Sequence, residues 1–159
     1  MEKKRERVRG WRDYETQRLR ESVKNSESQR LREFKRGYIT AALWSSVDPE
    51  ETPLDDPEKY GEDKLAAETV QKMESDCDKF IQLNDDDLRE YAEKRAIPIG
   101  AEYTAEECAG HDFWLTRAGH GVGFWDRGLG ELGERLSKAS RSFGESWLYV
   151  GDNGNLYTE

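Results

Sequence analysis

Residues 63–83 read DKLAAETVQKMESDCDKFIQL, and their apolar side chains recur with the period of an α-helix. The repeating positions, separated by four, three, four and three residues, are Ala66, Val70, Met73, Cys77 and Phe80. This spacing places the five side chains on one side of a helix. The segment therefore predicts an amphipathic helix over about 63–83.

Two further helices are predicted from the residues that start them. Asn84 is a candidate N-cap for a helix over about 85–94, and the three aspartates of its first turn face the positive end of the helix dipole. Thr104-Ala-Glu-Glu107 has the form of a capping box, which predicts a helix from there to about Arg117.

The rest of the C-terminal half predicts one more helix and a β-hairpin. Leucines and other apolar residues recur at helical spacing over about 129–143, and Gly144 ends the pattern. Asn153-Gly154 is a strong signal for a tight turn and predicts a hairpin over 147–158. Together with a helix over about 28–44, these elements predict a mainly α (α+β) fold of four to five helices with a C-terminal hairpin.

Charge is unevenly distributed along the chain. Residues 1–36 hold thirteen basic and seven acidic side chains, whereas residues 37–159 hold twelve basic and twenty-seven acidic ones. The first part predicts a basic helical arm over 1–27 and the rest an acidic domain over 28–159. Such a domain attracts basic protein surfaces and repels nucleic acid. Residues 47–61, which contain three prolines and six acids, are predicted to form a solvated connector.

The setting predicted for the chain is the cytoplasm. It contains no apolar run near the ~20 residues that a membrane span needs, and no apolar stretch of signal-peptide length near its start. Two cysteines, Cys77 and Cys108, are too few for the disulfide framework of a small secreted protein. We expect both to be thiols.

A glycine-rich stretch spells a nucleotide-binding fingerprint in a context that does not fit it. Gly128-Leu-Gly-Glu-Leu-Gly133 matches the dinucleotide motif, but that motif works only at a strand-to-helix turn of a βαβ unit, and no strand precedes it here. The narrower expectation is that Arg127 and the start of the following helix hold a phosphate or a carboxylate.

The segment from His111 to Arg127 combines two aromatic pairs, two histidines and several glycines. Part of it is expected to be core, because Phe and Trp bury large areas, while the glycines let the backbone approach a helix or a ligand closely. The candidate ligand- or partner-binding residues are His111, Asp112, Trp114, Arg117, His120, Phe124, Trp125, Asp126 and Arg127.

The same segment has side chains suited to metal binding or catalysis without the patterns that accompany them. Cys108, His111 and His120 are the metal-ligand candidates, but Cys-x2-His-x8-His is not a standard zinc spacing. A histidine could act as general base, yet no signature nucleophile accompanies it. We expect hydrogen-bonded histidines, no metal, no cofactor and a binding protein in place of an enzyme.

Several motifs resemble those of a family of small acidic proteins widespread in bacteriophages and prophages. The motifs are Gly37-Tyr-Ile-Thr-Ala-Ala-Leu-Trp-Ser-Ser46, Asp76-Cys77-x-x-Phe80, Ala109-Gly-His-Asp-Phe-Trp-Leu-Thr-Arg117, Gly119-His-Gly-x-Gly-Phe-Trp-Asp-Arg-Gly128 and Leu148-Tyr-Val-Gly-Asp152. The resemblance covers roughly residues 31–157 and leaves out the basic arm. It implies an origin and a setting, a small phage accessory protein inside a bacterium, and no particular chemistry.

Two functions are compatible with these observations. The first is a non-enzymatic protein that inhibits or modulates a host or defence protein with a basic surface, by presenting an acidic surface like that of nucleic acid. The second is a site for a small ligand, a nucleotide or a metal in the segment from His111 to Arg127, as a binding protein or an enzyme. The arm, residues 1–27, adds a basic cluster with Trp11 that could contact nucleic acid or a second protein, including another copy of the chain. The members of the cluster are Lys3, Lys4, Arg5, Arg7, Arg9 and Arg12. The oligomeric state, and whether His111 and His120 share a pocket, stay open at this point.

Overall fold

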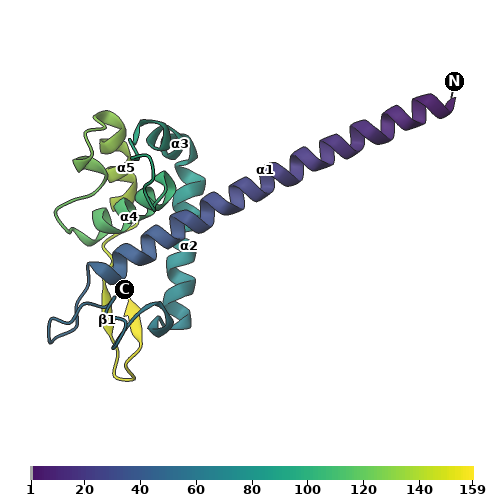
Figure 1. Cartoon of the computed structure of the whole chain (residues 1–159). Helices are drawn as coiled ribbons and strands as arrows, with labels where there is room; N and C mark the ends of the chain where they lie inside the picture. The colour runs from purple at the N-terminus through teal and green to yellow at the C-terminus, as the bar shows by residue number, and fades with distance from the viewer. Residues whose placement is uncertain (1) are drawn as a thin grey trace.

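The computed structural model describes the backbone of residues 2–159 and the side chains of residues 10–159. Residues 2–159 form five α-helices, two short 3₁₀-helices and one antiparallel hairpin (Figure 1). In chain order these are α1 (Glu2–Trp44), η1 (Glu62–Lys64), α2 (Ala67–Leu83), α3 (Asp85–Lys94), α4 (Ala105–Ala118), η2 (Phe124–Asp126), α5 (Glu131–Arg141), β1 (Leu148–Val150) and β2 (Leu156–Thr158). The predicted mainly helical fold with a C-terminal hairpin is confirmed. Among the helices of these residues, none has an apolar stretch long enough to cross a membrane.

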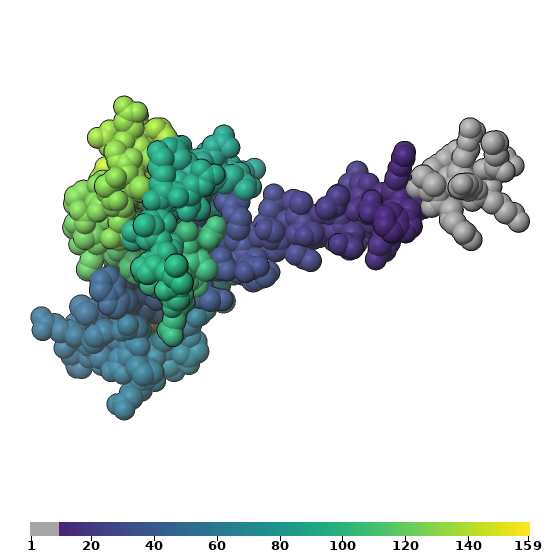
Figure 2. Space-filling view, turned by 45° about the horizontal axis from the view of Figure 1, so that its top comes forward, coloured from purple at the N-terminus to yellow at the C-terminus, as the bar shows by residue number. Residues whose placement is uncertain are grey.

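The first helix is unbroken, and half of it stands away from the rest of the molecule. Every side chain from Gly10 to Glu27 is exposed, and this part projects as a narrow stalk (Figures 1 and 2). Its residues favour the helix by themselves, and the Gln17 side chain donates a hydrogen bond to Glu21 one turn later. The helix predicted over 28–44 is therefore the C-terminal part of a longer one.

Two glycines bring α1 and α4 into direct backbone contact. Gly37 and Gly110 are both buried. A Cβ atom on Gly37 would overlap the carbonyl oxygen of Glu107, and one on Gly110 would overlap the carbonyl oxygen of Phe34. The two helices can cross this closely only because neither position carries a side chain.

Aromatic rings from three helices form the centre of the core. Phe113 of α4 stacks on Phe80 of α2, with 4.0 Å between ring centroids, and Tyr38 of α1 lies 5.1 Å from Phe113. From the apolar face predicted for α2, Met73 and Cys77 are buried beside Phe80. The helical period of that segment therefore identified the side that packs inward.

The start of α2 differs from its prediction. The helix begins at Ala67 and not near residue 63, because residues 62–64 form the separate turn η1. Leu65 then pairs with Leu156 of β2 as an isolated bridge. A contact with a strand ninety residues away along the chain thus sets this boundary, which no local pattern could show.

Asn84 does not act as predicted, although α3 has the predicted limits of 85–94. Its side chain makes no cap hydrogen bond to α3. Instead the Nδ2 group donates to the carbonyl oxygen of Phe80 (2.9 Å) and so satisfies the end of α2. The residue joins two consecutive helices, and its amide serves the first of them.

The capping box of α4 is confirmed in both halves. Thr104 Oγ1 accepts from the Glu107 backbone N–H (3.2 Å), and Glu107 Oε2 accepts from the Thr104 N–H (2.9 Å). The end predicted for α5 is too late: the helix ends at Arg141, and Gly144 lies beyond it with a φ of 80°.

The hairpin and the prolines near it form the end of the molecule opposite α3 and α5 (Figure 1). β1 pairs with β2 in the register Val150↔Leu156, and Gly154 of the predicted Asn-Gly turn has a φ of 81°. Leu148 and Leu156 point into the core. The segment 47–61 is not simply solvated, as predicted, because Leu54 and Tyr60 are also buried.

Asp48 holds the segment around the prolines in one conformation. Its Oδ1 accepts from the backbone N–H groups of Glu50 (2.9 Å) and Thr52 (2.8 Å), and its Oδ2 accepts from Lys59 Nζ (2.6 Å) and Tyr60 Oη (2.8 Å). These donors, with the Lys59 ammonium first, keep the pKa of the Asp48 carboxyl well below its usual range. The carboxylate is therefore a structural clamp.

Replacing Asp48 with asparagine is expected to loosen this segment, because a neutral amide has only one acceptor oxygen for four donors. Amide hydrogen exchange at Glu50 and Thr52 should become faster at neutral pH, whereas Asp55→Asn, an exposed position nearby, should leave it unchanged. In the unmodified chain the clamp is complete above the ordinary Asp pKa of about 3.9 and is lost as the pH falls toward the lowered pKa. Equal exchange in the two variants would contradict this role.

Candidate functional site

The candidate residues between His111 and Arg127 do not form one cluster. Three of them, Trp114, Arg117 and Phe124, are buried in the core. Asp112 and Arg127 form an ion pair with each other. The remaining four range from half-buried to exposed, and they are His111, His120, Trp125 and Asp126.

Trp114 and Phe124 stabilise the fold. Both side chains are completely buried. Trp114 Nε1 donates to Ser45 Oγ (2.9 Å), and the Phe124 ring packs edge-on against Tyr91, with centroids 5.5 Å apart. Neither ring is available to a ligand, so their assignment as binding residues is corrected to a core role. Aromatic residues of a core and of a binding site look alike in a sequence, because both contribute large apolar area.

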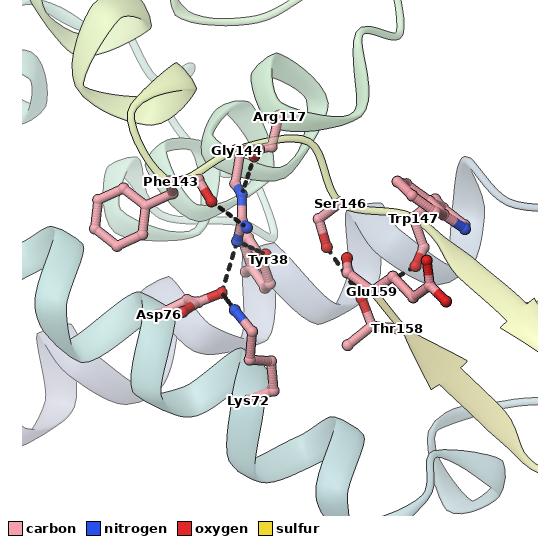
Figure 3. Close-up of polar contacts among 10 residues, drawn as sticks. All are labelled: Tyr38, Lys72, Asp76, Arg117, Phe143, Gly144, Ser146, Trp147, Thr158 and Glu159. Atoms are coloured by element: carbon pink, nitrogen blue, oxygen red, sulfur yellow. Dashed lines mark hydrogen bonds and ion pairs between the residues drawn. The ribbon is translucent and has the colours of Figure 1, made fainter.

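Arg117 is the centre of a buried polar network (Figure 3). Its Nη1 donates to Asp76 Oδ2 and to Tyr38 Oη, both at 2.8 Å. Its Nε and Nη2 donate to the carbonyl oxygens of Gly144 (3.0 Å) and Phe143 (3.1 Å). The side chain is 2% exposed. Arg117 therefore joins α1, α2 and the segment that follows α5 inside the molecule, and its assignment as a binding residue is also corrected.

Arg127, which was expected to hold a phosphate or a carboxylate ligand, pairs instead with the Asp112 carboxylate of the same chain. Arg127 Nη2 and Nε donate to Asp112 Oδ1 (2.7 and 3.0 Å), and Tyr91 Oη donates to Asp112 Oδ2 (2.8 Å). Hydrogen bonds to Asp112 raise the pKa of Arg127, and burial raises the pKa of Tyr91. Because Asp112 is almost fully buried, this arrangement anchors the loop after α4 to α3.

Both histidines lie close to the same exposed tryptophan. Trp44, the last residue of α1, is 52% exposed, and its ring centroid lies 5.8 Å from those of both His111 and His120. Burial lowers the pKa of His111. His120 is exposed, at the end of the turn that begins at Gly119. The histidines thus share a neighbour, and His111 alone of the two borders the pocket described next.

A pocket of about 420 Å³ lies beside the crossing of α1 and α4. The side chains that give it chemical character are Arg36, Arg95, Tyr103, Cys108, His111 and Arg127. Arg36, Arg95 and Tyr103 had no sequence signal, since they are single residues from different segments, and only the fold brings them together. Cys108 is half-buried, and burial raises the pKa of its thiol.

The metal-ligand candidates do not converge. Cys108 and His111 border the pocket, whereas His120 is not among its lining residues and lies against Trp44. Within residues 10–159 no group of three or more His, Cys, Asp or Glu side chains is placed to hold a metal ion.

Trp125 and Asp126 are exposed on η2. In the arm, Trp11 and Arg12 are exposed, and the side chains of Lys3, Lys4, Arg5, Arg7 and Arg9 lie outside the described residues.

A second surface of distinct character lies at the end of the molecule that contains the hairpin. Residues 48–68, called the acidic segment below, have nine acidic and two basic side chains, a net charge of −7. Seven of the nine acids are exposed.

Comparison of the chain with protein-family models, curated proteins and solved structures found no significant match. What the chain does must therefore follow from its own contacts, burial and charge.

Proposed function

We propose that this chain is a non-enzymatic binding protein, a phage-encoded accessory protein of the bacterial cytoplasm, which modulates or inhibits a host or defence protein with a basic surface. The observation that carries the proposal is the acidic segment, which combines a net charge of −7 with a conformation held by Asp48. A surface that is already ordered loses little conformational entropy on binding. Its carboxylates would also speed the encounter with a cationic partner.

Exposed aromatic side chains lie at the same end of the molecule. Trp147 is 47% and Tyr149 41% exposed, and Tyr149 stacks on Tyr157 across the hairpin, with ring centroids 5.9 Å apart. Leu65, within the acidic segment, is paired with β2, which connects the two features. Large rings of this kind anchor protein interfaces, while charges at the rim set specificity and the rate of association. The partner is expected to place cations on the acidic segment and an apolar hollow on Trp147.

The internal use of the reactive candidates also supports a binding function. Arg117 and Asp112, which would be the charged groups of a reaction centre, have their hydrogen bonds within the fold. The acidic segment, by contrast, presents closely spaced carboxylates to solvent, as nucleic acid presents phosphates. A partner whose basic groove normally holds nucleic acid would therefore be blocked by this surface.

The test is capture from bacterial lysate at low and moderate salt, with proteins quantified by mass spectrometry. Two variants each lose four carboxylates, one set from the acidic segment and one from elsewhere. The first carries Asp55→Asn, Glu58→Gln, Glu62→Gln and Glu68→Gln; the second carries Glu93→Gln, Glu102→Gln, Glu131→Gln and Glu134→Gln. We expect a basic protein that the unmodified chain and the second variant retain and the first variant loses, with weaker retention at moderate salt.

A third variant, Trp147→Ala, separates specific binding from general attraction of charge. It keeps every carboxylate, so a partner held only by net charge would be retained fully. We expect faster dissociation of the specific partner, because truncation of a central aromatic residue acts mainly on the dissociation rate. Retention that is the same for all three variants would refute the proposal.

A further inference from the structure

The pocket beside the crossing of α1 and α4 differs in charge from the rest of the molecule. Residues 37–159 have a net charge of −15, yet two of their arginines, Arg95 and Arg127, line this one hollow together with Arg36. They come from α1, the end of α3 and the loop after η2. A volume of about 420 Å³ is within the range of pockets that enclose small molecules.

The carboxylates in the pocket wall are already engaged. Glu107 accepts from Arg36 Nη1 (2.9 Å) and from the Thr104 N–H of the capping box. Asp112 accepts from Arg127 and Tyr91. Neither acid pairs with Arg95. With three arginines and two carboxylates, the pocket lining therefore has an excess of positive charge.

Arg95 is the group that lacks a partner. Its Nε is buried, and among residues 10–159 it makes no hydrogen bond. No side-chain hydrogen bond or salt bridge of the rest of its guanidinium is found within the same residues either. The Nη groups of Arg95, which are not among the buried atoms without a partner in residues 10–159, are the donors that a bound anion would meet with charge-assisted hydrogen bonds.

Two aromatic rings complete the wall. Tyr103 lines the pocket and is 46% exposed, and His111 lines it while packed against Trp44. Because burial lowers the pKa of His111, its imidazole is neutral at neutral pH and offers a flat face and a hydrogen bond without repelling a cationic or neutral base. Planar rings of a ligand stack on such surfaces.

We propose that this pocket binds a mononucleotide-sized molecule, with its phosphate on Arg95 and its planar base against Tyr103 and His111. The arginine fork fits phosphate oxygens in pairs, which sets the orientation of the ligand. The site is separate from the acidic segment and involves none of its residues. Its presence or absence therefore does not decide the proposed function.

The experiment is isothermal titration calorimetry of the full chain with three probes: adenosine 5′-monophosphate, adenosine and inorganic phosphate. We expect the nucleotide to bind at least tenfold more tightly than either part, since one lacks the anion and the other the ring. Arg95→Gln should weaken nucleotide binding at least tenfold. Arg135→Gln, which removes a half-exposed arginine of α5 that pairs with Asp87 and Glu90, should leave it unchanged.

Arg95→Gln is expected to fold normally, because no hydrogen bond of that side chain is lost, and circular dichroism with a thermal melt verifies this. A second readout is the NMR signal of the His111 ring, which nucleotide should shift in the unmodified chain and not in Arg95→Gln. Absence of nucleotide binding would overturn the proposal. So would nucleotide binding of equal strength in Arg95→Gln and the unmodified chain, or phosphate binding as tight as that of the nucleotide.

Discussion

Replacing Arg117 with methionine is expected to lower the free energy of unfolding by about 3–5 kcal/mol, the usual effect of breaking a buried ion pair. Methionine fills a similar volume, so the loss measures polar contacts and not a cavity. The variant leaves Tyr38 and the carbonyl groups of Phe143 and Gly144 without their donor inside the molecule. Asp76 retains only Lys72, whose side chain is half-exposed. Urea denaturation followed by circular dichroism measures the change.

Two companion variants make this prediction specific. Arg135→Met breaks an ion pair at the surface with Asp87 and is expected to leave the denaturation midpoint almost unchanged. Adding Asp76→Leu to Arg117→Met should recover part of the loss, because the partner carboxylate is then no longer buried without its arginine. A similar loss for Arg117→Met and Arg135→Met would show that the buried network contributes little to stability.

The second large effect is expected at the crossing of α1 and α4. Gly37→Ala and Gly110→Ala should each destabilise the domain by about 1–3 kcal/mol, the usual range for overpacking a core. In each variant the new methyl group would meet a main-chain carbonyl of the facing helix, which cannot turn aside as a side chain can. This loss of stability is expected even though alanine stabilises a helix by about 1 kcal/mol relative to glycine. Chemical denaturation again provides the measurement.

The matched control lies on the same helix. Gly10 has no atom within 4 Å of the position that a Cβ would take. Gly10→Ala should therefore leave the domain intact and raise helicity slightly, as propensity alone predicts. If Gly37→Ala were as well tolerated as Gly10→Ala, the close crossing would not be a requirement of the fold.

Local patterns were sufficient for the helices that carry their own start and stop signals. The capping box of Thr104 and Glu107, the period of Met73, Cys77 and Phe80, and the turn at Asn153-Gly154 each depend on neighbours within a few residues. The start of α2 and the role of Asn84 were predicted wrongly. Local propensity does not determine either feature. The start of α2 depends on the pairing of Leu65 with β2, and the role of Asn84 depends on its hydrogen bond to the preceding helix.

In the candidate site, the contrast between what local sequence predicts and what distant contacts decide is larger. Residue types between His111 and Arg127 indicated chemistry, but a buried arginine and a ligand-binding arginine are identical in a sequence. Arg117 lies in the core because Asp76 and Tyr38 meet it there from two other helices. Arg95 is a candidate for ligand binding because its Nε has no hydrogen-bond partner within the described residues.

By itself the sequence determined the elements, the acidic body and the set of reactive side chains, because helical period, capping and net charge are properties of neighbouring residues and of composition. Only the tertiary structure decided which charges are paired inside the molecule and which face solvent. That distinction depends on contacts between segments up to about a hundred residues apart, such as Arg117 with Tyr38 and Leu65 with Leu156. The physical reason is that burial and pairing, which set the free energy of a charged group, belong to its surroundings in space.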